Sequence, residues 1–132
     1  MELDMTEYSA VPFVEKGRSV NGWDCWGLVY VIYRDLRGIK LPRYTEDYDY
    51  TSPENEKERG RLIEKERLSW VEVDRPEPWD VVVLRLKNQP MHVGIYIGNG
   101  KMIHCMYGVG TTVEVLNSYC WRNRIVGYYR YA

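Results

Sequence analysis

Several features that would narrow the function of a 132-residue chain are scarce in this sequence. Lysine and arginine (18) nearly balance aspartate and glutamate (19), so the net charge of −1 gives no general attraction to nucleic acid or anionic lipid. No run approaches the roughly 18 apolar residues of a membrane span. Three cysteines, an odd number, argue against a disulfide framework and indicate synthesis in a reducing cytoplasm. We expect no nucleic-acid partner and no membrane insertion.

The chain also lacks internal repeats and low-complexity linkers, and its first residues form no apolar run. Residues Met1–Met5 are acidic, so we expect no signal peptide. A chain of this length buries roughly two-thirds of its surface in one core, which predicts a single domain over residues 1–132. Twelve tyrosines and five tryptophans stand against one phenylalanine. Such amphipathic aromatics suit contact surfaces, or packing that needs a polar handle.

Cys25 opens a segment with helical periodicity. Apolar residues recur at i, i+3, i+4, i+7 and i+8 through Leu36, Asp24 is a suitable N-cap, and Arg37-Gly38 is a suitable end. The thiol therefore lies in the first turn, where unpaired N–H groups and the helix dipole favour a thiolate. The alternative is a small apolar residue on a buried helix face.

Both histidines of the chain fall in one predicted hairpin. The β-branched and aromatic runs His92–Ile97 and Lys101–Met106 are separated by Gly98-Asn99-Gly100. The other strand candidates are Val81–Leu86, Val113–Leu116 and Ile125–Tyr131. Ser52-Pro53-Glu54 predicts the start of a second helix that continues as a charged segment through Arg67.

The length of the hairpin loop decides which faces the histidines occupy. A two-residue turn would send His92 and His104 to opposite faces. A three-residue loop pairs Ile97 with Lys101, places Gly94 opposite His104, and puts both histidines on one face. Their backbones are then roughly 7–8 Å apart, within reach of an imidazole–imidazole hydrogen bond. The same register turns an apolar set to the other face as core: Val93, Ile95, Ile97, Ile103 and Cys105.

A thiol and two histidines allow more than one interpretation. Each histidine alone could be a satisfied core residue, but the pair together with Cys25 favours a catalytic site. Cys25, His92, His104 and Cys105 also resemble a zinc ligand set. Because neighbours on a strand point to opposite faces, and no Cys-x-x-Cys or His-x-x-x-His spacing exists, we expect no metal and no cofactor.

Three segments resemble the NlpC-type papain-like cysteine peptidases, which cut bacterial cell-wall peptides. Asn21–Val29 is similar to the cysteine motif of that family, Trp79–Val83 to the strand entered through a Gly-Asp-Leu type motif, and His92–His104 to the histidine hairpin. The resemblance implies an α+β fold in which the central helix carrying the cysteine packs on an antiparallel β-sheet.

The resemblance also implies a mechanism of acyl transfer. Cys25 would attack the amide carbonyl as a thiolate, His92 would accept its proton and return one to the leaving amine, and His104 would orient the His92 ring. The expected bond is the γ-D-glutamyl to diamino acid link of a peptidoglycan stem peptide. Asp24 could meet a substrate amine, but we favour its N-cap role as the explanation.

The closer resemblance is to the branch found in phage tail tips and gene transfer agents. Trp26 stands where cell-wall hydrolases carry serine, and the ending Trp121–Tyr131 is also similar to that branch. Phe13 occupies the region where many cell-wall members place a substrate-binding tyrosine. The candidate substrate-binding residues are therefore Asp24, Trp26 and Phe13.

Three functions follow as expectations. The first is a tail-tip endopeptidase of the virion, synthesised in the host cytoplasm, acting in the periplasm or cell wall on peptidoglycan peptides, and held by tail-tip or hub proteins. The second is a structural tail-tip component that keeps the fold without activity. The third is a secreted antibacterial effector of the same fold.

Overall fold

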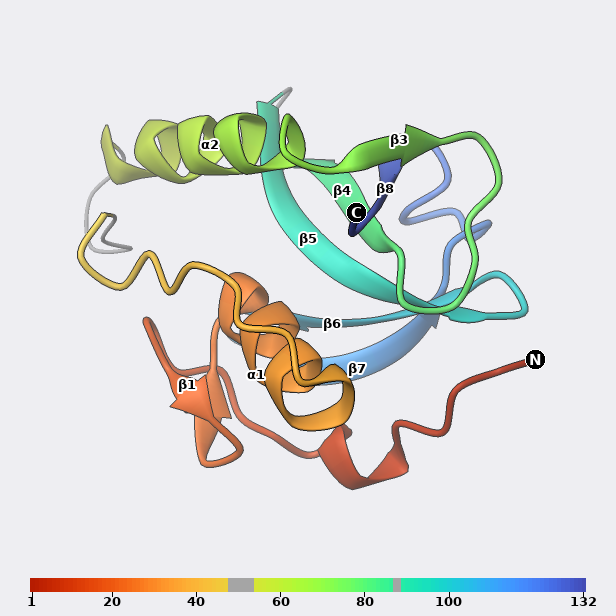
Figure 1. Ribbon diagram of the computed structural model, residues 1–132, viewed down its shortest axis with the longest axis horizontal. Helices are drawn as coiled ribbons and strands as arrows, with labels where there is room; N and C mark the ends of the chain where they lie inside the picture. The colour runs from red at the N-terminus through yellow and green to blue at the C-terminus, as the bar shows by residue number, and fades with distance from the viewer. Residues whose placement is uncertain (48–53, 87–88) are drawn as a thin grey trace.

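The computed structural model describes residues 1–47, 54–86 and 89–132 (Figure 1). A six-stranded antiparallel sheet has the order β3-β8-β4-β5-β6-β7, and the helix α1 packs against β5 and β6 while α2 packs against β5. The predicted α+β layout, a helix that begins at the cysteine and packs on an antiparallel sheet, is confirmed. The elements of the sheet and its helices are α1 (Cys25–Arg37), α2 (Glu54–Arg67), β3 (Val71–Val73), β4 (Val81–Leu86), β5 (Gln89–Gly98), β6 (Lys101–Met106), β7 (Gly110–Val115) and β8 (Ile125–Arg130).

The limits of α1 agree with the sequence prediction. The Asp24 side chain accepts a hydrogen bond from the backbone N–H of Gly27, which caps the first turn. Gly38, at a φ of 65°, ends the helix in the left-handed conformation, and its N–H bonds to the carbonyl of Arg34. Every residue from Cys25 to Tyr33 is buried, because the helix lies between the sheet and the N-terminal segment.

The predicted register of the β5–β6 hairpin is confirmed at the histidines, but the predicted loop length is wrong. Gly94 does pair with His104. Gly98, however, pairs with Lys101, so the turn has two residues, Asn99 and Gly100, both with positive φ. That is the geometry of a tight hairpin turn.

An irregularity in β5 reconciles the two-residue turn with the shared face. The register shifts between Tyr96 and Gly98, so Ile97 is the additional residue on its strand and the expected Ile97–Lys101 pair does not form. A bulge of one residue reverses the alternation of side chains, which returns His92 and His104 to the same face. The predicted outcome therefore arises from a bulge rather than from a longer loop.

Other elements differ at their ends. Strand β7 begins three residues before the predicted Val113, and β8 ends one residue before Tyr131. The sequence predictions missed β3 and three short N-terminal elements. These are η1 (Thr6–Tyr8), β1 (Arg18–Ser19) and β2 (Gly22–Trp23). The predicted second helix is present as α2, while Ser52 and Pro53, expected to open it, lie outside the described residues.

Both faces of the sheet carry hydrophobic clusters. The larger cluster joins α1 to the odd-numbered residues of β5, including Val93, Ile95 and Ile97. The smaller cluster lies on the other face, where Met102 and Trp121 pack together. Neither helix of the described residues has the length and hydropathy that crossing a membrane requires.

Candidate active site

Cys25 is the first residue of α1 and is only 7% exposed. The segment that leads into it is fixed to the sheet by Trp23. The Trp23 indole N–H donates to Thr111 Oγ1 at 2.8 Å, and its carbonyl accepts from Cys105 Sγ at 3.4 Å. Because Cys105 directly follows His104 on β6, the start of α1 lies close to that histidine along the strand.

The residue after the cysteine gives a second reference point. Trp26 and Val93 line the same small cavity of about 20 Å³, and Val93 directly follows His92 on β5. Trp23, two residues before Cys25, thus bonds to the strand neighbour of His104, and Trp26, one residue after it, shares a cavity with the strand neighbour of His92. The start of α1 therefore lies against the stretches of β5 and β6 that carry the histidines, on the face to which Val93 and Cys105 point. The alternation of side chains turns His92 and His104 toward Trp121 on the other face.

The two histidines are joined directly. His92 Nε2 and His104 Nδ1 are 2.7 Å apart, the rings are inclined at 77°, and the residues are 3% and 0% exposed. On the far side of the pair, His104 Nε2 bonds to the carboxylate of Glu114 on β7. The sequence prediction that the two histidines share a face within hydrogen-bonding distance is confirmed.

Burial keeps both rings neutral near pH 7. Desolvation, with smaller effects from the charges of His104 and Arg59, lowers the pKa of His92 to about 3. Desolvation also lowers the pKa of His104, although the bond to Glu114 and its negative charge oppose the change. A neutral imidazole has one nitrogen that can accept a proton, which is the form that a general base requires.

Trp121 covers the histidine pair. Its ring is stacked on His92, with centroids 6.0 Å apart and planes 20° apart, and meets His104 edge to face at 5.1 Å. Trp121 is 5% exposed, so it shields the hydrogen bond between the histidines from water.

Sequence reasoning assigned no role in the site to Glu114 or Trp121. Glu114 pairs with Met102, and side-chain alternation from that pairing would have placed it on the face of His104. Trp121 follows β7 in an irregular loop, where no periodicity indicates its position.

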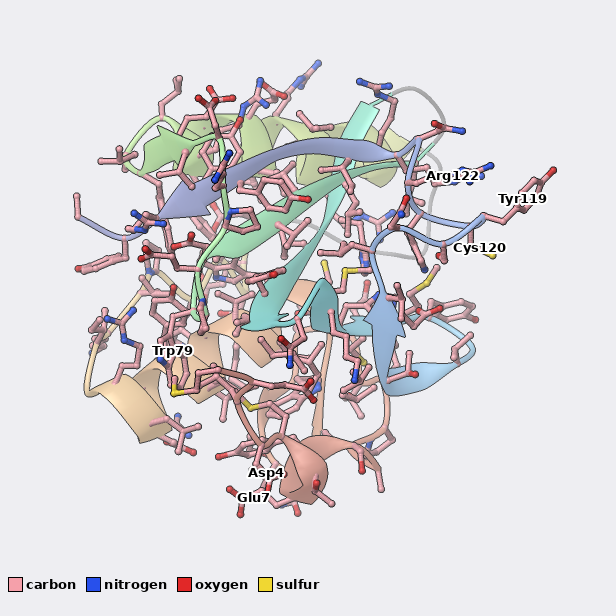
Figure 2. The ribbon with its side chains drawn as sticks, turned by 90° about the vertical axis from the view of Figure 1, so that its right-hand side faces the viewer. Asp4, Glu7, Trp79, Tyr119, Cys120 and Arg122 are labelled. Carbon is pink, nitrogen blue, oxygen red and sulfur yellow. The ribbon has the colours of Figure 1, made fainter. Side chains whose placement is uncertain are left out.

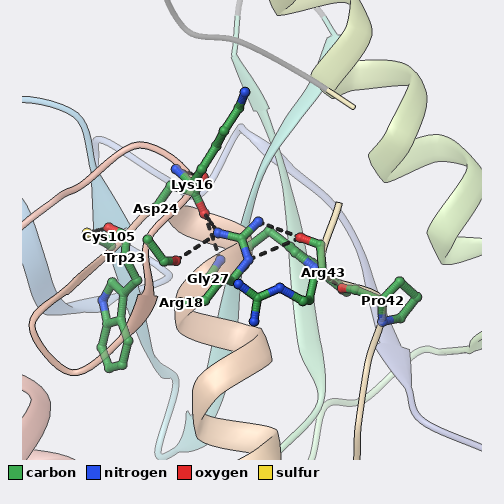
Figure 3. A network of polar contacts seen from close by, with 10 residues as sticks. Lys16, Arg18, Trp23, Asp24, Gly27, Pro42, Arg43 and Cys105 are labelled. Atoms are coloured by element: carbon green, nitrogen blue, oxygen red, sulfur yellow. Dashed lines mark hydrogen bonds and ion pairs between the residues drawn. The ribbon is translucent and has the colours of Figure 1, made fainter. Parts of the chain in front are cut away.

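The carboxylate of Asp24 is occupied by the protein itself (Figure 3). Besides the N-cap bond, it accepts from Lys16 N–H at 2.9 Å and from Arg18 Nη1 at 2.9 Å, and the residue is fully buried. Arg18 donates in turn to the carbonyl of Arg43 at 3.1 and 2.6 Å. The predicted N-cap is confirmed, and this network fixes the helix start that carries the thiol.

The other two candidates for substrate binding differ in exposure. Trp26 is 8% exposed and donates from its indole N–H to the carbonyl of Pro42 at 2.7 Å. Phe13 is half-buried, forms an isolated bridge with Trp23, and meets the exposed ring of Tyr107 edge to face at 5.5 Å. Phe13 thus lies beside the segment leading to Cys25 and keeps part of its surface accessible.

The remaining cysteines have different environments. Burial raises the pKa of the Cys105 thiol, which disfavours the thiolate there. Cys120 is exposed on the loop between β7 and β8, close to Tyr119 and Arg122 (Figure 2). Within the described ranges, no group of three or more His, Cys, Asp or Glu side chains is arranged to hold a metal ion.

The model of the NlpC/P60 family matches residues 10–130, which is almost the whole chain. The chain belongs to the NlpC/P60 family. A solved NlpC/P60 protein from Bacillus cereus superposes with a TM-score of 0.70 at 26% identity, covering 94% of this chain and 36% of that one. The expected papain-like NlpC/P60 fold is therefore confirmed.

Three curated proteins of different named functions are similar in sequence to this NlpC/P60 chain. "Murein DD-endopeptidase MepS/Murein LD-carboxypeptidase" of Escherichia coli K12 is 27% identical over 89% of this chain and 54% of its own length. "Gamma-DL-glutamyl hydrolase" of Bacillus subtilis is 32% identical over 89% of this chain and 24% of its own. "Tail tip assembly protein K" of Escherichia phage N15 is 26% identical over 92% of this chain and 50% of its own. The chain spans about half the length of the first of these relatives.

Proposed function

We propose that this NlpC/P60 chain is a cysteine peptidase that hydrolyses amide bonds in peptidoglycan peptides, and that residues 1–132 form one catalytic domain. Cys25 is the nucleophile, His92 the general base and His104 the residue that orients it. The observation that carries the proposal is the buried His92–His104 hydrogen bond on β5 and β6, the two strands against which the cysteine-bearing helix α1 packs. Relatives named as murein endopeptidases support the substrate class.

The first chemical step forms the acyl-enzyme. Cys25 Sγ attacks the scissile carbonyl carbon while its proton passes to Nδ1 of His92, the nitrogen that does not bond to His104. The carbonyl becomes an oxyanion, and the backbone N–H of Cys25 at the helix start is a suitable donor to it. His92 then returns its proton to the leaving nitrogen, the C–N bond breaks, and an amine departs from the thioester.

The second step releases the acyl group. His92 removes a proton from water, the hydroxide attacks the thioester carbonyl, and the C–S bond breaks. The proton returns to sulfur, so Cys25 and neutral His92 are both restored. No redox partner or metal takes part, and each proton removed in one half-reaction is returned within it.

Substrate contact is proposed for Phe13, whose partly accessible ring lies beside the segment leading to Cys25. Asp24 and Trp26, named with it on sequence grounds, are almost wholly buried. In this proposal they act on the substrate through Cys25, because their hydrogen bonds fix the first turn of α1.

The bond proposed for cleavage is the γ-D-glutamyl to diamino acid link. The relative from Bacillus subtilis named as a gamma-DL-glutamyl hydrolase supports it, whereas the name of the Escherichia coli relative points to a DD bond. The proposed setting is a phage tail tip, with tail-tip or hub proteins as partners and action in the periplasm or cell wall. The relative from phage N15 supports that setting, and its printed name equally favours an assembly component as the second candidate.

Digestion of purified peptidoglycan tests the activity and the bond together. Fragments released by the wild-type protein and by Cys25→Ala are identified by mass spectrometry, with Cys120→Ala as the matched control because that thiol is exposed on another loop. We expect new amine ends from the wild type and from Cys120→Ala, and none from Cys25→Ala. Silence from all three folded proteins would favour the assembly component, and equal digestion by Cys25→Ala would refute the nucleophile.

A further inference from the structure

We propose that Glu114 is a positioning residue that sets the tautomer of both histidines and thereby leaves Nδ1 of His92 free to accept a proton. The inference rests on the proposed peptidase function, because only a reaction needs that nitrogen as a base. It starts from a chain of three side chains: the Glu114 carboxylate, His104 and His92.

The direction of the chain follows from the number of protons available. A carboxylate only accepts, so His104 Nε2, which bonds to Glu114, must carry its hydrogen. A neutral imidazole has one N–H, so His104 Nδ1 is left with a lone pair. That nitrogen is 2.7 Å from His92 Nε2, which must then be the donor. The single hydrogen of His92 is thus on Nε2, and its Nδ1 is bare.

Without Glu114 the same two rings could bond in the opposite sense. His104 would donate from Nδ1 to Nε2 of His92, and the hydrogen of His92 would move to Nδ1. A protonated Nδ1 cannot remove a proton from a thiol. The carboxylate therefore selects the reactive one of two arrangements that have the same heavy-atom geometry.

The sheet places Glu114 where this role requires it. On β7 it pairs with Met102 of β6, and His104 pairs with Thr112, so Glu114 and His104 are diagonal neighbours on one face. The Glu114 side chain is 34% exposed while that of His104 is 0% exposed, so the carboxylate keeps contact with water as it bonds to a buried ring. Its negative charge favours a positive charge on the His104 ring, to which it bonds.

Nitrogen-15 NMR of the histidine side chains tests the tautomers without any substrate. The chain has two histidines, so a protein labelled at histidine gives two readable ring systems. We expect both rings neutral near pH 7, with hydrogen on Nε2 and a bare Nδ1. Glu114→Gln should keep this pattern, since its amide oxygen still accepts from His104, whereas Glu114→Ala should lose it. Hydrogen on Nδ1 of His92 in the wild type, or an unchanged pattern in Glu114→Ala, would overturn the proposal.

Kinetics then separate positioning from a structural role. By analogy with residues that orient catalytic histidines, Glu114→Ala should lower kcat/KM by about 10- to 100-fold through kcat, and Glu114→Gln should lose less. Because removing a negative charge favours proton loss from neighbouring groups, the limbs of the pH–rate profile should move to lower pH in both variants. The control Glu72→Gln, exposed on β3, should change neither quantity. An unmoved profile with full activity in Glu114→Ala would refute the role.

The two tests distinguish two different failures. If the protein cuts no peptide, the NMR pattern still decides whether Glu114 sets the tautomers. If peptide is cut but the tautomers do not depend on Glu114, only the inference fails. Glu114→Gln nearly preserves the volume of the side chain, so it remains informative should Glu114→Ala not fold.

Discussion

The two halves of the candidate site are held in different ways. The thiol depends on a helix start, where the Asp24 carboxylate caps α1 and pairs with Arg18 in a fully buried network. The imidazoles depend on three neighbouring strands and a chain of side-chain bonds that ends at the partly exposed Glu114. The network around Asp24 stabilises the folded helix start, whereas the chain of bonds through the histidines fixes which ring nitrogens carry hydrogen. Substitutions in the two halves should therefore fail in different ways.

The largest expected effect is on catalysis, at the histidines. His92→Ala should lower kcat by at least about 10³-fold, as loss of a catalytic base does in enzymes that use a nucleophile and base together. Because the two groups act as a unit, adding Cys25→Ala should cost little more. Initial rates on peptidoglycan fragments check both variants, with circular dichroism to confirm the fold. If the losses in kcat of the two single variants instead multiply in the double variant, Cys25 and His92 do not act as a unit.

The second effect is on stability, at the helix start. Arg18→Met leaves the fully buried Asp24 carboxylate without its cation, so the free energy of unfolding should fall by about 3–5 kcal/mol. Glu114→Gln, in the other half, should cost less than about 1 kcal/mol because its oxygen still accepts and the site is partly exposed. Urea denaturation measures both values. Equal losses in the two variants would contradict the contrast between the halves.

This contrast also explains how much the sequence alone could predict. The start and end of α1, its N-cap and its buried face follow from neighbouring residues, so Asp24 and Gly38 were correctly assigned. The face of the histidines was predicted correctly through the wrong loop, because a bulge at Ile97 depends on how two strands fit rather than on turn residues alone. Glu114 and Trp121 belong to other segments and come to the site only through folding.

A third effect is the dependence of stability on pH, which arises in the histidine half. The folded pKa of His92 is lowered to about 3, and that of His104 is lowered as well, while unfolded histidine titrates near 6.5. The unfolded chain therefore binds more protons below pH 6.5, and stability that is complete above this value is lost as pH falls. Well below pH 6.5 the slope should approach about 1.4 kcal/mol per pH unit from His92, with a further contribution of the same sign from His104.

Urea denaturation between pH 7 and pH 5 measures this slope. His104→Gln should reduce it, because one titrating ring is then absent. Stability that stays constant over this range in the wild type would mean that the buried rings are not held neutral.

The smallest expected effect is on substrate binding beside the helix start. Phe13→Leu should raise KM by roughly fivefold, about 1 kcal/mol of lost aromatic contact, with little change in kcat. Val20→Ala, at an exposed residue of the same N-terminal region, is the matched control. Steady-state kinetics on a soluble stem peptide make the comparison. A loss confined to kcat would instead place Phe13 among the residues that support Cys25.

The most direct test of the central claim, that Cys25 and the histidine pair form one acyl-transfer site, is the intact mass of the protein quenched with acid during turnover. Purified peptidoglycan fragments should add the mass of their acyl portion to Cys25, and the adduct should be absent from Cys25→Ala and strongly reduced in His92→Ala. An acyl group on another residue, or undiminished cleavage by Cys25→Ala, would contradict the account.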